Sequence, residues 1–542
     1  MSLDDFFLFL QRVFDRLIRR LRVGPPPREG GRRFLIVQID GLSRSVLERA
    51  LAEGRMPFLA RLLERGRHRL QPMAVGMPTS TPAFQMAVMY GVRPDIPAFH
   101  YHDKRRRADI YFPRGGDAAH VEAAQGAGRR GILQGGSTYG CVFTGGAANS
   151  LFSFAMIKRP TGEGLLRAIS AGVVLGWVLL EGTTVTAITL ARALLAFIAD
   201  PLRGQARGWR WLAIKLGISV WLRELFTLAV SRDLYQGAPA VYVNYLDYDV
   251  FAHAFGPRHR SALRALRRVD RSIHQLWRVL RRVPEHGYDL YILSDHGQAA
   301  CRPFIRLTGG RPIERLLFED YLEPPGLREI RPDDPHGRRL RGGIKAFRSG
   351  RAAGLFQRFV NYLEADFPWL LGEVKQARER GGVRVVAAGP NALVYWVDVE
   401  EPLMLAEIEA RVPGLAEALS GSPGIGFVLV RTADGPVCWW RGKGYVLSRE
   451  QPGPFAGRSD LDLVLQGIRD LMAMRSAGDL VIYGIDAPGG NVSFVPELGA
   501  HAGPSADELH TFIISPTGAA LPEPITHPIQ LYPHFIRYQE AA

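Results

Sequence analysis

The clearest pattern of apolar and polar positions lies near the start of the chain. An almost unbroken apolar run at 34–39, FLIVQI, leads directly into Asp40 and Gly41. A short apolar run that ends at a turn residue predicts a buried strand. Open α/β sheets bind ligands outside the carboxyl ends of such strands, so Asp40 is a candidate site residue. Taken alone, Asp-Gly is equally typical of an ordinary turn.

Strand and helix patterns then alternate over the first 300 residues. Apolar positions at helical spacing predict helices over 44–65 and 259–282. Short apolar runs predict a strand over 238–246 and another within 288–297 that ends in Asp295-His296-Gly297. Strands that alternate with helices are typical of an α/β fold with a mostly parallel sheet.

A further helix is predicted within 77–91. Pro82 suits the start of a helix and Gly91 its end, which makes Thr81 the predicted N-cap. The Thr81 hydroxyl would then lie at the positive end of a helix, where an anion is stabilised. Most Thr-Pro pairs at helix starts serve only as caps. Thr81 is therefore a candidate site residue only in combination with the other motifs of the chain.

The pattern changes in the second half of the chain. Residues 306–345 are rich in Arg, Pro and Gly and predict loop, whereas 355–450 predict helices and strands of a separate α+β module. We therefore expect four parts. Residues 1–30 form an amphipathic N-terminal helix and a linker, and residues 31–305 form the first part of a catalytic α/β domain, with an apolar helical insertion at about 165–232. Residues 306–470 form the inserted α+β module, and residues 471–542 form the second part of the catalytic domain.

Two apolar segments suggest contact with a membrane. The N-terminal segment, predicted as a helix over 1–23, has apolar residues on one side and arginines on much of the rest, which favours a membrane surface or docking on its own domain. Residues 168–199 are the most apolar stretch, but Glu181 interrupts them, so a helix that packs on a partner helix or dips into the membrane interface is favoured over a membrane span. The order of charge and apolar residues at the start differs from a cleavable signal peptide, and we expect a membrane-associated protein on the cytoplasmic side.

Composition narrows the chemistry only slightly. A net charge of +15 suits anionic lipid, nucleic acid or phosphorylated substrates and does not choose among them. No nucleic-acid recognition motif is present, so no nucleic-acid partner is expected. The three cysteines lie far apart, which argues against a disulfide framework and a thiolate zinc cluster and makes Asp and His the candidate metal ligands.

Seven residues carry the candidate chemistry, most of them at predicted strand ends. They are Asp40, Thr81, Asp249, His253, Asp295, His296 and His501. The spacing of Asp249 and His253 places both on one face of a helical turn. Carboxylate and imidazole ligands suit divalent ions such as zinc, and two such ions can share a phosphoryl transfer.

In this order, the motifs resemble the alkaline phosphatase superfamily, and most closely its type I phosphodiesterase/nucleotide pyrophosphatase branch. The matching motifs are IDG at 39–41, PTSTPAF with a glycine ten residues after Thr81, DxxxH at 249–253, SDHG at 294–297 and GAHAG at 499–503. The resemblance covers about 34–303 and 478–516. It implies an alkaline phosphatase-like sandwich, in which a mostly parallel sheet lies between helices.

The resemblance also implies roles for the seven residues. Asp40, Thr81, Asp295 and His296 look like the ligands of one zinc ion, with Thr81 also the nucleophile. Asp249, His253 and His501 look like the ligands of a second. Manganese is the alternative metal. The implied reaction forms and then hydrolyses a phosphothreonine.

One segment departs from the family pattern. Nucleotide-cleaving relatives carry an asparagine after the nucleophile that holds a phosphate oxygen, whereas here the segment is Phe99-His100-Tyr101-His102-Asp103, followed by the basic run 104–107. A histidine, a tyrosine or a basic residue could replace it, or the run could be a solvated loop.

We therefore expect a phosphodiesterase or nucleotide pyrophosphatase acting on a nucleotide or a lipid-like diester, with contact to a membrane surface. A phosphomonoesterase, a lipid-directed phospho-group transferase and a cofactor-independent mutase are the alternatives within the superfamily. A sulfatase is disfavoured because Thr81-Pro82-Ala83 does not fit the C/S-x-P-x-R motif. From another class, an inactive membrane-associated binding protein remains open.

Overall fold

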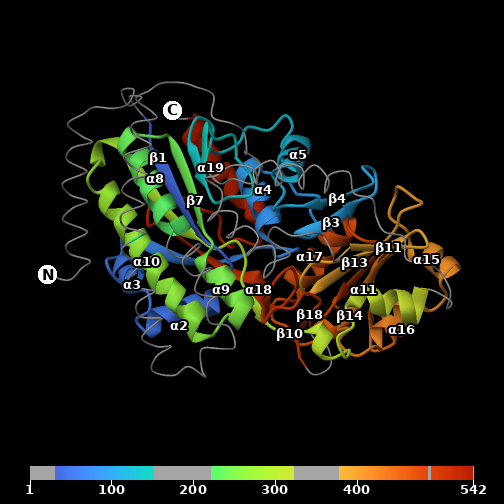
Figure 1. The fold of residues 1–542 in the computed structure, drawn as a ribbon. Coiled ribbons are helices and arrows are strands. Elements are labelled where there is room, and N and C mark those ends of the chain that lie inside the picture. Colours follow the sequence, from blue (N-terminus) through green and yellow to red (C-terminus); the bar gives the residue numbers. More distant parts are fainter. Residues whose placement is uncertain (1–30, 152–182, 184–220, 323–376, 486–489, 541–542) are drawn as a thin grey trace.

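The structure, a computed structural model, describes residues 31–151, 183, 221–322, 377–485 and 490–540. Two seven-stranded sheets dominate this part of the chain. Figure 1 shows them side by side, the first in blue and green and the second in orange. The predicted N-terminal helix, most of the apolar segment 168–199 and the predicted helix 355–365 lie outside the described residues.

The first sheet is the mostly parallel α/β sheet that the sequence predicts. Its strand order is β2-β20-β8-β1-β7-β5-β6, and only β20 runs against its neighbours. The strands are β1 (Arg33–Ile39), β2 (His68–Ala74), β5 (Ser137–Tyr139), β6 (Asn149–Leu151), β7 (Ala240–Tyr245), β8 (Tyr288–Leu293) and β20 (His510–Pro516). β1 is buried along its whole length, as its apolar run requires.

Helices cover both faces of this sheet, because alternate side chains of each strand point to opposite faces. One face of β1, which carries Leu35 and Val37, packs with α2, α3, α8, α9 and α10. The other face, which carries Phe34 and Ile36, packs with α4, α5 and α19. The helices are α2 (Arg44–Ala52), α3 (Pro57–Glu64), α4 (Thr81–Tyr90), α5 (Gly115–Gln125), α8 (Arg223–Gln236), α9 (Asp247–Phe255), α10 (Arg260–Leu280) and α19 (Tyr532–Glu540).

The second sheet is antiparallel throughout. Its order is β11-β12-β13-β17-β14-β15-β16. The strands are β11 (Ala377–Arg380), β12 (Val383–Ala387), β13 (Asn391–Trp396), β14 (Phe427–Thr432), β15 (Gly435–Trp440), β16 (Lys443–Val446) and β17 (Leu480–Tyr483). Three helices, α11 (Ile313–Leu317), α15 (Leu405–Arg411) and α16 (Leu415–Ser420), pack on one face, and α17 (Leu461–Ala473) packs on the other.

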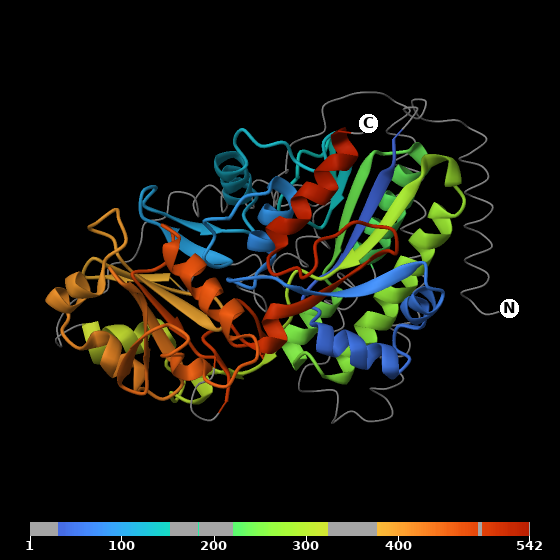
Figure 2. The same ribbon diagram turned by 180° about the vertical axis from the view of Figure 1, so that it is seen from behind.

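A single hydrophobic cluster joins the two sheets. It runs from Phe34 of β1 through α4 and α17 to Tyr395 and Tyr483 of the second sheet. The hairpin of β3 (His100–Asp103) and β4 (Ala108–Tyr111) lies between them and contacts β12. In Figure 2, which shows the reverse side, α17 and this hairpin are seen where the two sheets meet.

Several predicted elements differ in detail. The helix predicted over 44–65 is two helices, because Gly54 adopts a positive φ of 63° and Pro57 starts a new helix. Ser80, and not Thr81, is the N-cap of α4, so Thr81 is the first helical residue. The predicted loop 306–345 contains α11 and a following helical turn at Phe318–Leu322 within its described part.

Strand β17 lies beyond residue 470, where we expected the inserted module to end. It occupies the centre of the second sheet, between β13 and β14. The second sheet therefore takes its central strand from the segment expected to complete the first domain. In the part of the chain that the structure describes, no helix combines the length and the apolar character that a membrane crossing requires.

Candidate metal centre

Three neighbouring strands of the first sheet bring the candidate residues together at their carboxyl ends. β1 lies between β7 and β8 in parallel register, with Gln38 beside Asn244 and Leu293. Asp40 therefore follows β1 close to Asp295 and His296, which follow β8. This is the edge at which open α/β sheets bind ligands.

The first group consists of Asp40, Asp295 and His296, all of them buried. Their ligand atoms lie within 4.8 Å of one another. The Nε2 of His296 is 3.6 Å from Oδ1 of Asp40 and 3.4 Å from Oδ2 of Asp295. The backbone N–H of Gly41 donates to Oδ1 of Asp295 at 3.3 Å, which fixes that carboxylate beside the end of β1.

Thr81 joins this first group from the start of α4. Its Oγ1 donates to Oδ1 of Asp40 at 3.4 Å and lies 3.2 Å from Nε2 of His296. Every residue of α4 is buried, so the packing holds the hydroxyl at this point. The location at the first helical residue also exposes Thr81 to the positive end of the helix.

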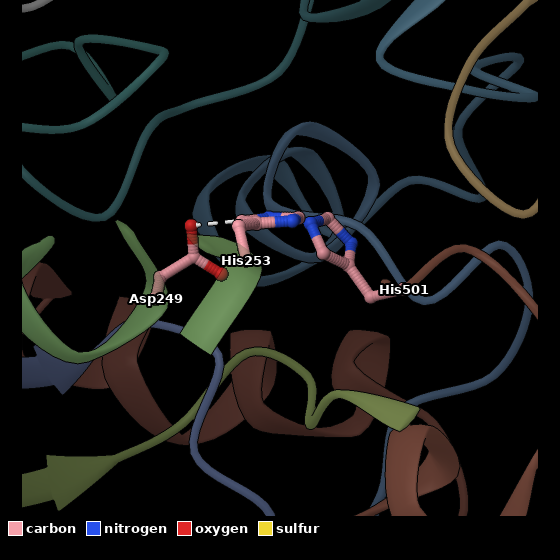
Figure 3. Close-up of side chains that lie close together, drawn as sticks. All are labelled: Asp249, His253 and His501. Carbon is pink, nitrogen blue, oxygen red and sulfur yellow. Dashed lines mark ion pairs between the residues drawn. The ribbon is translucent and has the colours of Figure 1, made fainter. Parts of the chain in front are cut away.

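The second group consists of Asp249, His253 and His501, which are half-buried. Figure 3 shows Asp249 and His253 side by side on α9, with His501 approaching from another segment. Oδ2 of Asp249 is 3.4 Å from Nε2 of His253, as the one-turn spacing predicts. The His501 ring stacks on that of His296 with centroids 3.7 Å apart, so the two groups adjoin.

A short strand pair places His501. β19 (Gly499–Ala500) pairs with β9 (Ala299–Ala300), which begins just after His296. Gly499 is required for this approach, because a Cβ there would lie 2.4 Å from the Ala252 carbonyl oxygen. Gly41 has a similar role, since it adopts a φ of 72° and its Cβ would lie 2.6 Å from Oδ1 of Asp249.

All three histidines direct Nδ1 toward a backbone carbonyl. The distances are 2.8 Å from His253 to Gly499, 2.9 Å from His501 to Thr79, and 3.1 Å from His296 to Gly297. A proton on Nδ1 leaves Nε2 with its lone pair, which is the tautomer that a metal ligand needs. The backbone therefore prepares each of the three rings for the same task.

The electrostatics also fit a bound cation. Burial, with repulsion from Asp295 and Asp249, raises the pKa of Asp40 well above its usual range, and burial raises the pKa of Asp295 to about 7. Burial lowers the pKa of His296 to about 4 and that of His501 to about 3. His253 differs, because the charges of Asp249 and Glu497 outweigh burial and raise its pKa well above its usual range, while His253 lowers the pKa of Asp249. In the first group, crowded carboxylates beside a neutral histidine are unfavourable alone, and a divalent cation reverses that balance.

The side chains that contact the seven candidate residues and orient them were not predicted from the sequence. Asn244 donates to Oδ2 of Asp40 at 2.6 Å, Glu497 lies 2.8 Å from Nδ1 of His253, and Gln298 donates to Asp249. Asn244 does have a recognisable signal, because it is a polar residue near the end of an apolar strand beside Asp40. Glu497 and Gln298 show no comparable pattern.

The segment that departs from the family pattern points toward the second sheet. Nζ of Lys104 is 2.8 Å from Asp479, and Arg105 pairs with Glu401 at 2.9 Å. His102 contacts Asp109 at 2.9 Å. Lys104, Arg105 and His102 therefore have partners outside the two groups, and the basic run is partly structural rather than a solvated loop.

Comparison with known sequences identifies a family for part of the chain. Residues 186–338 match the sequence model described as type I phosphodiesterase / nucleotide pyrophosphatase. The matched segment contains Asp249, His253, Asp295 and His296. The predicted resemblance is thus confirmed over these residues, and with it the expected class of enzyme, a hydrolase of phosphoric ester bonds. No curated protein matches the sequence.

Solved structures show a weaker likeness. Phosphonoacetate hydrolase from Sinorhizobium meliloti 1021, in complex with phosphonoformate, is 15% identical with a TM-score of 0.47, covering 95% of this chain and 96% of its own. Murine ectonucleotide pyrophosphatase / phosphodiesterase 5, in an inactive form with AMP, is 11% identical with a TM-score of 0.44, covering 94% and 96%.

Proposed function

Proceeding from the family match over 186–338, we propose that this chain is a divalent-metal-dependent phosphodiesterase with Thr81 as its nucleophile. The observation that carries the proposal is the position of the Thr81 hydroxyl. It lies within 3.4 Å of both Asp40 and His296, at the start of a helix. The hydroxyl can act as the nucleophile at this position, and the positive end of the helix beside it can stabilise negative charge on the phosphoryl group.

Two hydroxyls adjoin Thr81 and serve as a comparison. Thr79 donates to the Gly503 carbonyl at 3.1 Å and accepts from the Ala502 N–H at 2.9 Å, so it holds the His501 segment. Ser80 is the N-cap of α4. Thr81 is the hydroxyl of the three that contacts the first group.

The residues fit two divalent ions. Asp40, Thr81, Asp295 and His296 would hold one, and Asp249, His253 and His501 the other, with zinc favoured by the mixture of oxygen and nitrogen ligands and manganese as the alternative. Such ions, when bound, lower the pKa of oxygen nucleophiles and neutralise charge on phosphoryl oxygens.

The chain itself supplies the rest of the reaction. In the first step the Thr81 Oγ1 loses its proton and attacks phosphorus, an Oγ1–P bond forms, the bond from phosphorus to the leaving oxygen breaks, and the leaving oxygen takes up a proton from solvent. Asp40 orients the hydroxyl through its Oδ1. In the second step water attacks phosphorus, the Oγ1–P bond breaks, and free Thr81 and a phosphomonoester result. The N-terminus of α4 stabilises the negative phosphoryl oxygens in both steps.

The test compares hydrolysis of bis-p-nitrophenyl phosphate and p-nitrophenyl phosphate, with zinc, with manganese and with a chelator. We expect metal-dependent cleavage of the diester, a loss of about a thousandfold or more in Thr81→Ala, and nearly full activity in the matched variant Ser80→Ala. Residual diester activity in Thr81→Ala close to that of the wild type would exclude Thr81 as the nucleophile.

The remaining outcomes separate the alternatives. A strong preference for the monoester would indicate a phosphatase. Activity on neither ester with metal bound would favour a transferase that acts on a lipid-like substrate. Absence of both activity and bound metal would favour a binding protein. Nucleotide and lipid-like diesters are then distinguished by direct assay of each.

A further inference from the structure

Helix α10 carries a continuous basic stripe on its outer side. Arginines recur at every third or fourth position, which is the spacing of one helical face, and His274 continues the same row. His274 and Arg278 are half-buried, and the other members of the row are exposed. The stripe consists of Arg260, Arg264, Arg267, Arg271, His274, Arg278 and Arg281. The helix has 21 residues, so the stripe extends over about 30 Å.

The acidic residue of α10 does not offset this charge at the surface. Asp270 is buried and accepts the backbone N–H groups of Phe58 and Leu59 at 3.0 and 2.9 Å. Within the described residues, Arg61, Arg65 and Arg281 form no ion pair with an acidic side chain. The outer side of α10 and the adjacent α3 therefore present cations to the solvent.

The last turns of α10 and the helix α3 enclose a hollow of about 160 Å³. Four arginines, Arg61, Arg65, Arg278 and Arg281, surround it, and Phe58, Leu62, His274 and Trp277 line it. Phe58 stacks on His274 with centroids 4.6 Å apart, and Trp277 lies 6.5 Å from Phe58. Burial, followed by the charges of Arg278, Arg61 and Arg65, lowers the pKa of His274 to about 4, which reflects the positive potential there.

This hollow is separate from the metal centre. None of its lining residues belongs to either group of candidate ligands, and the centre adjoins the opposite end of α10 through α9. In Figure 1, α3 and α10 lie on the side of the first sheet that faces away from the second sheet.

We propose that the α10 stripe and the α3–α10 hollow form a docking surface for an anionic phospholipid bilayer, with a lipid phosphate group bound among the four arginines. Charge complementarity supports this occupant, because basic residues near an anionic bilayer add to its attraction one by one. The hollow adds an aromatic and apolar base, and tryptophan is favoured at the boundary between lipid headgroups and acyl chains.

The shape of the surface favours a bilayer over a nucleic acid. α10 is packed between α8, α9 and α3, so a single row of its side chains is exposed. Reading a nucleic-acid groove requires an element that protrudes far enough to enter it. A flat anionic surface requires only the exposed row. The surface is also independent of the N-terminal segment and of the proposed catalytic role of Thr81.

The first experiment measures sedimentation of the full chain with vesicles. Vesicles of equal parts phosphatidylcholine and phosphatidylglycerol are compared with phosphatidylcholine alone, at low and at high salt. We expect salt-sensitive binding to the anionic vesicles only. Each arginine accounts for roughly a fivefold change in affinity, so Arg61→Gln/Arg65→Gln/Arg281→Gln should weaken binding on the order of a hundredfold.

The matched control is Arg129→Gln/Arg469→Gln/Arg537→Gln, which removes the same charge from exposed positions outside α3 and α10. We expect the control to bind nearly as the wild type does. Both triple variants should cleave a soluble diester as the wild type does, which shows that they are folded. If both triple variants bound anionic vesicles equally weakly, the proposal would be overturned, because vesicle binding would then depend only on the net charge of the protein.

A second measurement locates the contact. Cys141, Cys301 and Cys438 are buried, so an environment-sensitive dye can be attached selectively to Arg271→Cys or, as a control, to Arg129→Cys. We expect a blue shift on anionic vesicles at position 271 and none at position 129. Vesicle binding without a change at position 271 would place the contact on another segment and overturn the proposal.

A soluble competitor separates the lipid from other sources of phosphate. Glycerol 3-phosphate or a short DNA duplex is added to the dye-labelled Arg271→Cys protein without vesicles. We expect neither to reproduce the vesicle response. A full response to glycerol 3-phosphate, or to DNA but not to vesicles, would assign the surface to that ligand and overturn the bilayer proposal.

Discussion

At the scale of single residues, backbone carbonyls and buried polar side chains determine which atoms of the candidate metal ligands are available to a cation. The three histidine rings are each fixed through Nδ1, and Asp40 is fixed by Asn244. The seven candidate residues could be singled out from the sequence because residue type and spacing carried the signal. The polar side chains that contact these residues could not be predicted, because a glutamate or a glutamine beside a ligand has the same sequence pattern as any other polar residue.

His527 gives a prediction for pH dependence. Its Nδ1 accepts the N–H of Ile529 at 3.2 Å and caps the helical turn Pro528–Leu531, and burial lowers its pKa to about 4. Because the unfolded histidine titrates near its ordinary value of about 6.5, the unfolded chain binds the proton first. The free energy of unfolding should therefore fall as the pH drops from about 6.5 to about 4.

The variant His527→Asn isolates this contribution. Its Oδ1 can accept the same N–H at any pH in this range. Urea unfolding at a series of pH values should show a shallower decline for His527→Asn than for the wild type. Parallel curves for the two proteins would show that His527 does not contribute to the slope.

At the scale of elements, the start of α3 depends on a residue of α10. Pro57 has no N–H, Met56 provides no side-chain cap, and Asp270 accepts the next two N–H groups. The sequence predicted one helix over 44–65 because the apolar spacing continues through the break. The contact with Asp270 stabilises a new start at Pro57, and apolar spacing cannot reveal a contact between residues so far apart.

Replacement of Asp270 should test that dependence. We expect Asp270→Ala to lower the free energy of unfolding by about 2–4 kcal/mol, because it leaves two buried N–H groups without an acceptor. Asp270→Asn keeps one carbonyl oxygen as an acceptor, so its free energy of unfolding should fall by less. Urea unfolding at neutral pH measures both, and a change in Asp270→Ala within the experimental error would contradict this assignment.

At the scale of the whole molecule, the two sheets share a core, and a buried ion pair joins the β3–β4 hairpin to the start of β17 in the second sheet. Lys104, at the tip of the β3–β4 hairpin, contacts Asp479 at 2.8 Å, and Asp479 also accepts the N–H groups of Trp396 and Leu403. The sequence predicted the first sheet and, after residue 306, a separate α+β module. The place of β17 depends on pairing with β13 and β14 on both sides, and local patterns carry no information on such distant pairing.

The ion pair between Lys104 and Asp479 should contribute to stability across this junction. Lys104→Met leaves a buried carboxylate without its cation, so we expect a loss of about 3–5 kcal/mol in the free energy of unfolding. Adding Asp479→Asn to that variant removes the unpaired charge and should restore part of the loss. Urea unfolding of the three variants completes the cycle, and strictly additive losses would show that the two side chains are not coupled.

The distance in sequence between the parts of the metal centre also has a consequence for synthesis on the ribosome. Asp40 is among the first residues of the first sheet, whereas His501 comes after β17, the central strand of the second sheet. A growing chain thus holds Thr81, Asp249, Asp295 and His296 long before the last candidate ligand is translated. Under the proposed function, the growing chain can gain activity only after all strands of the second sheet have been translated.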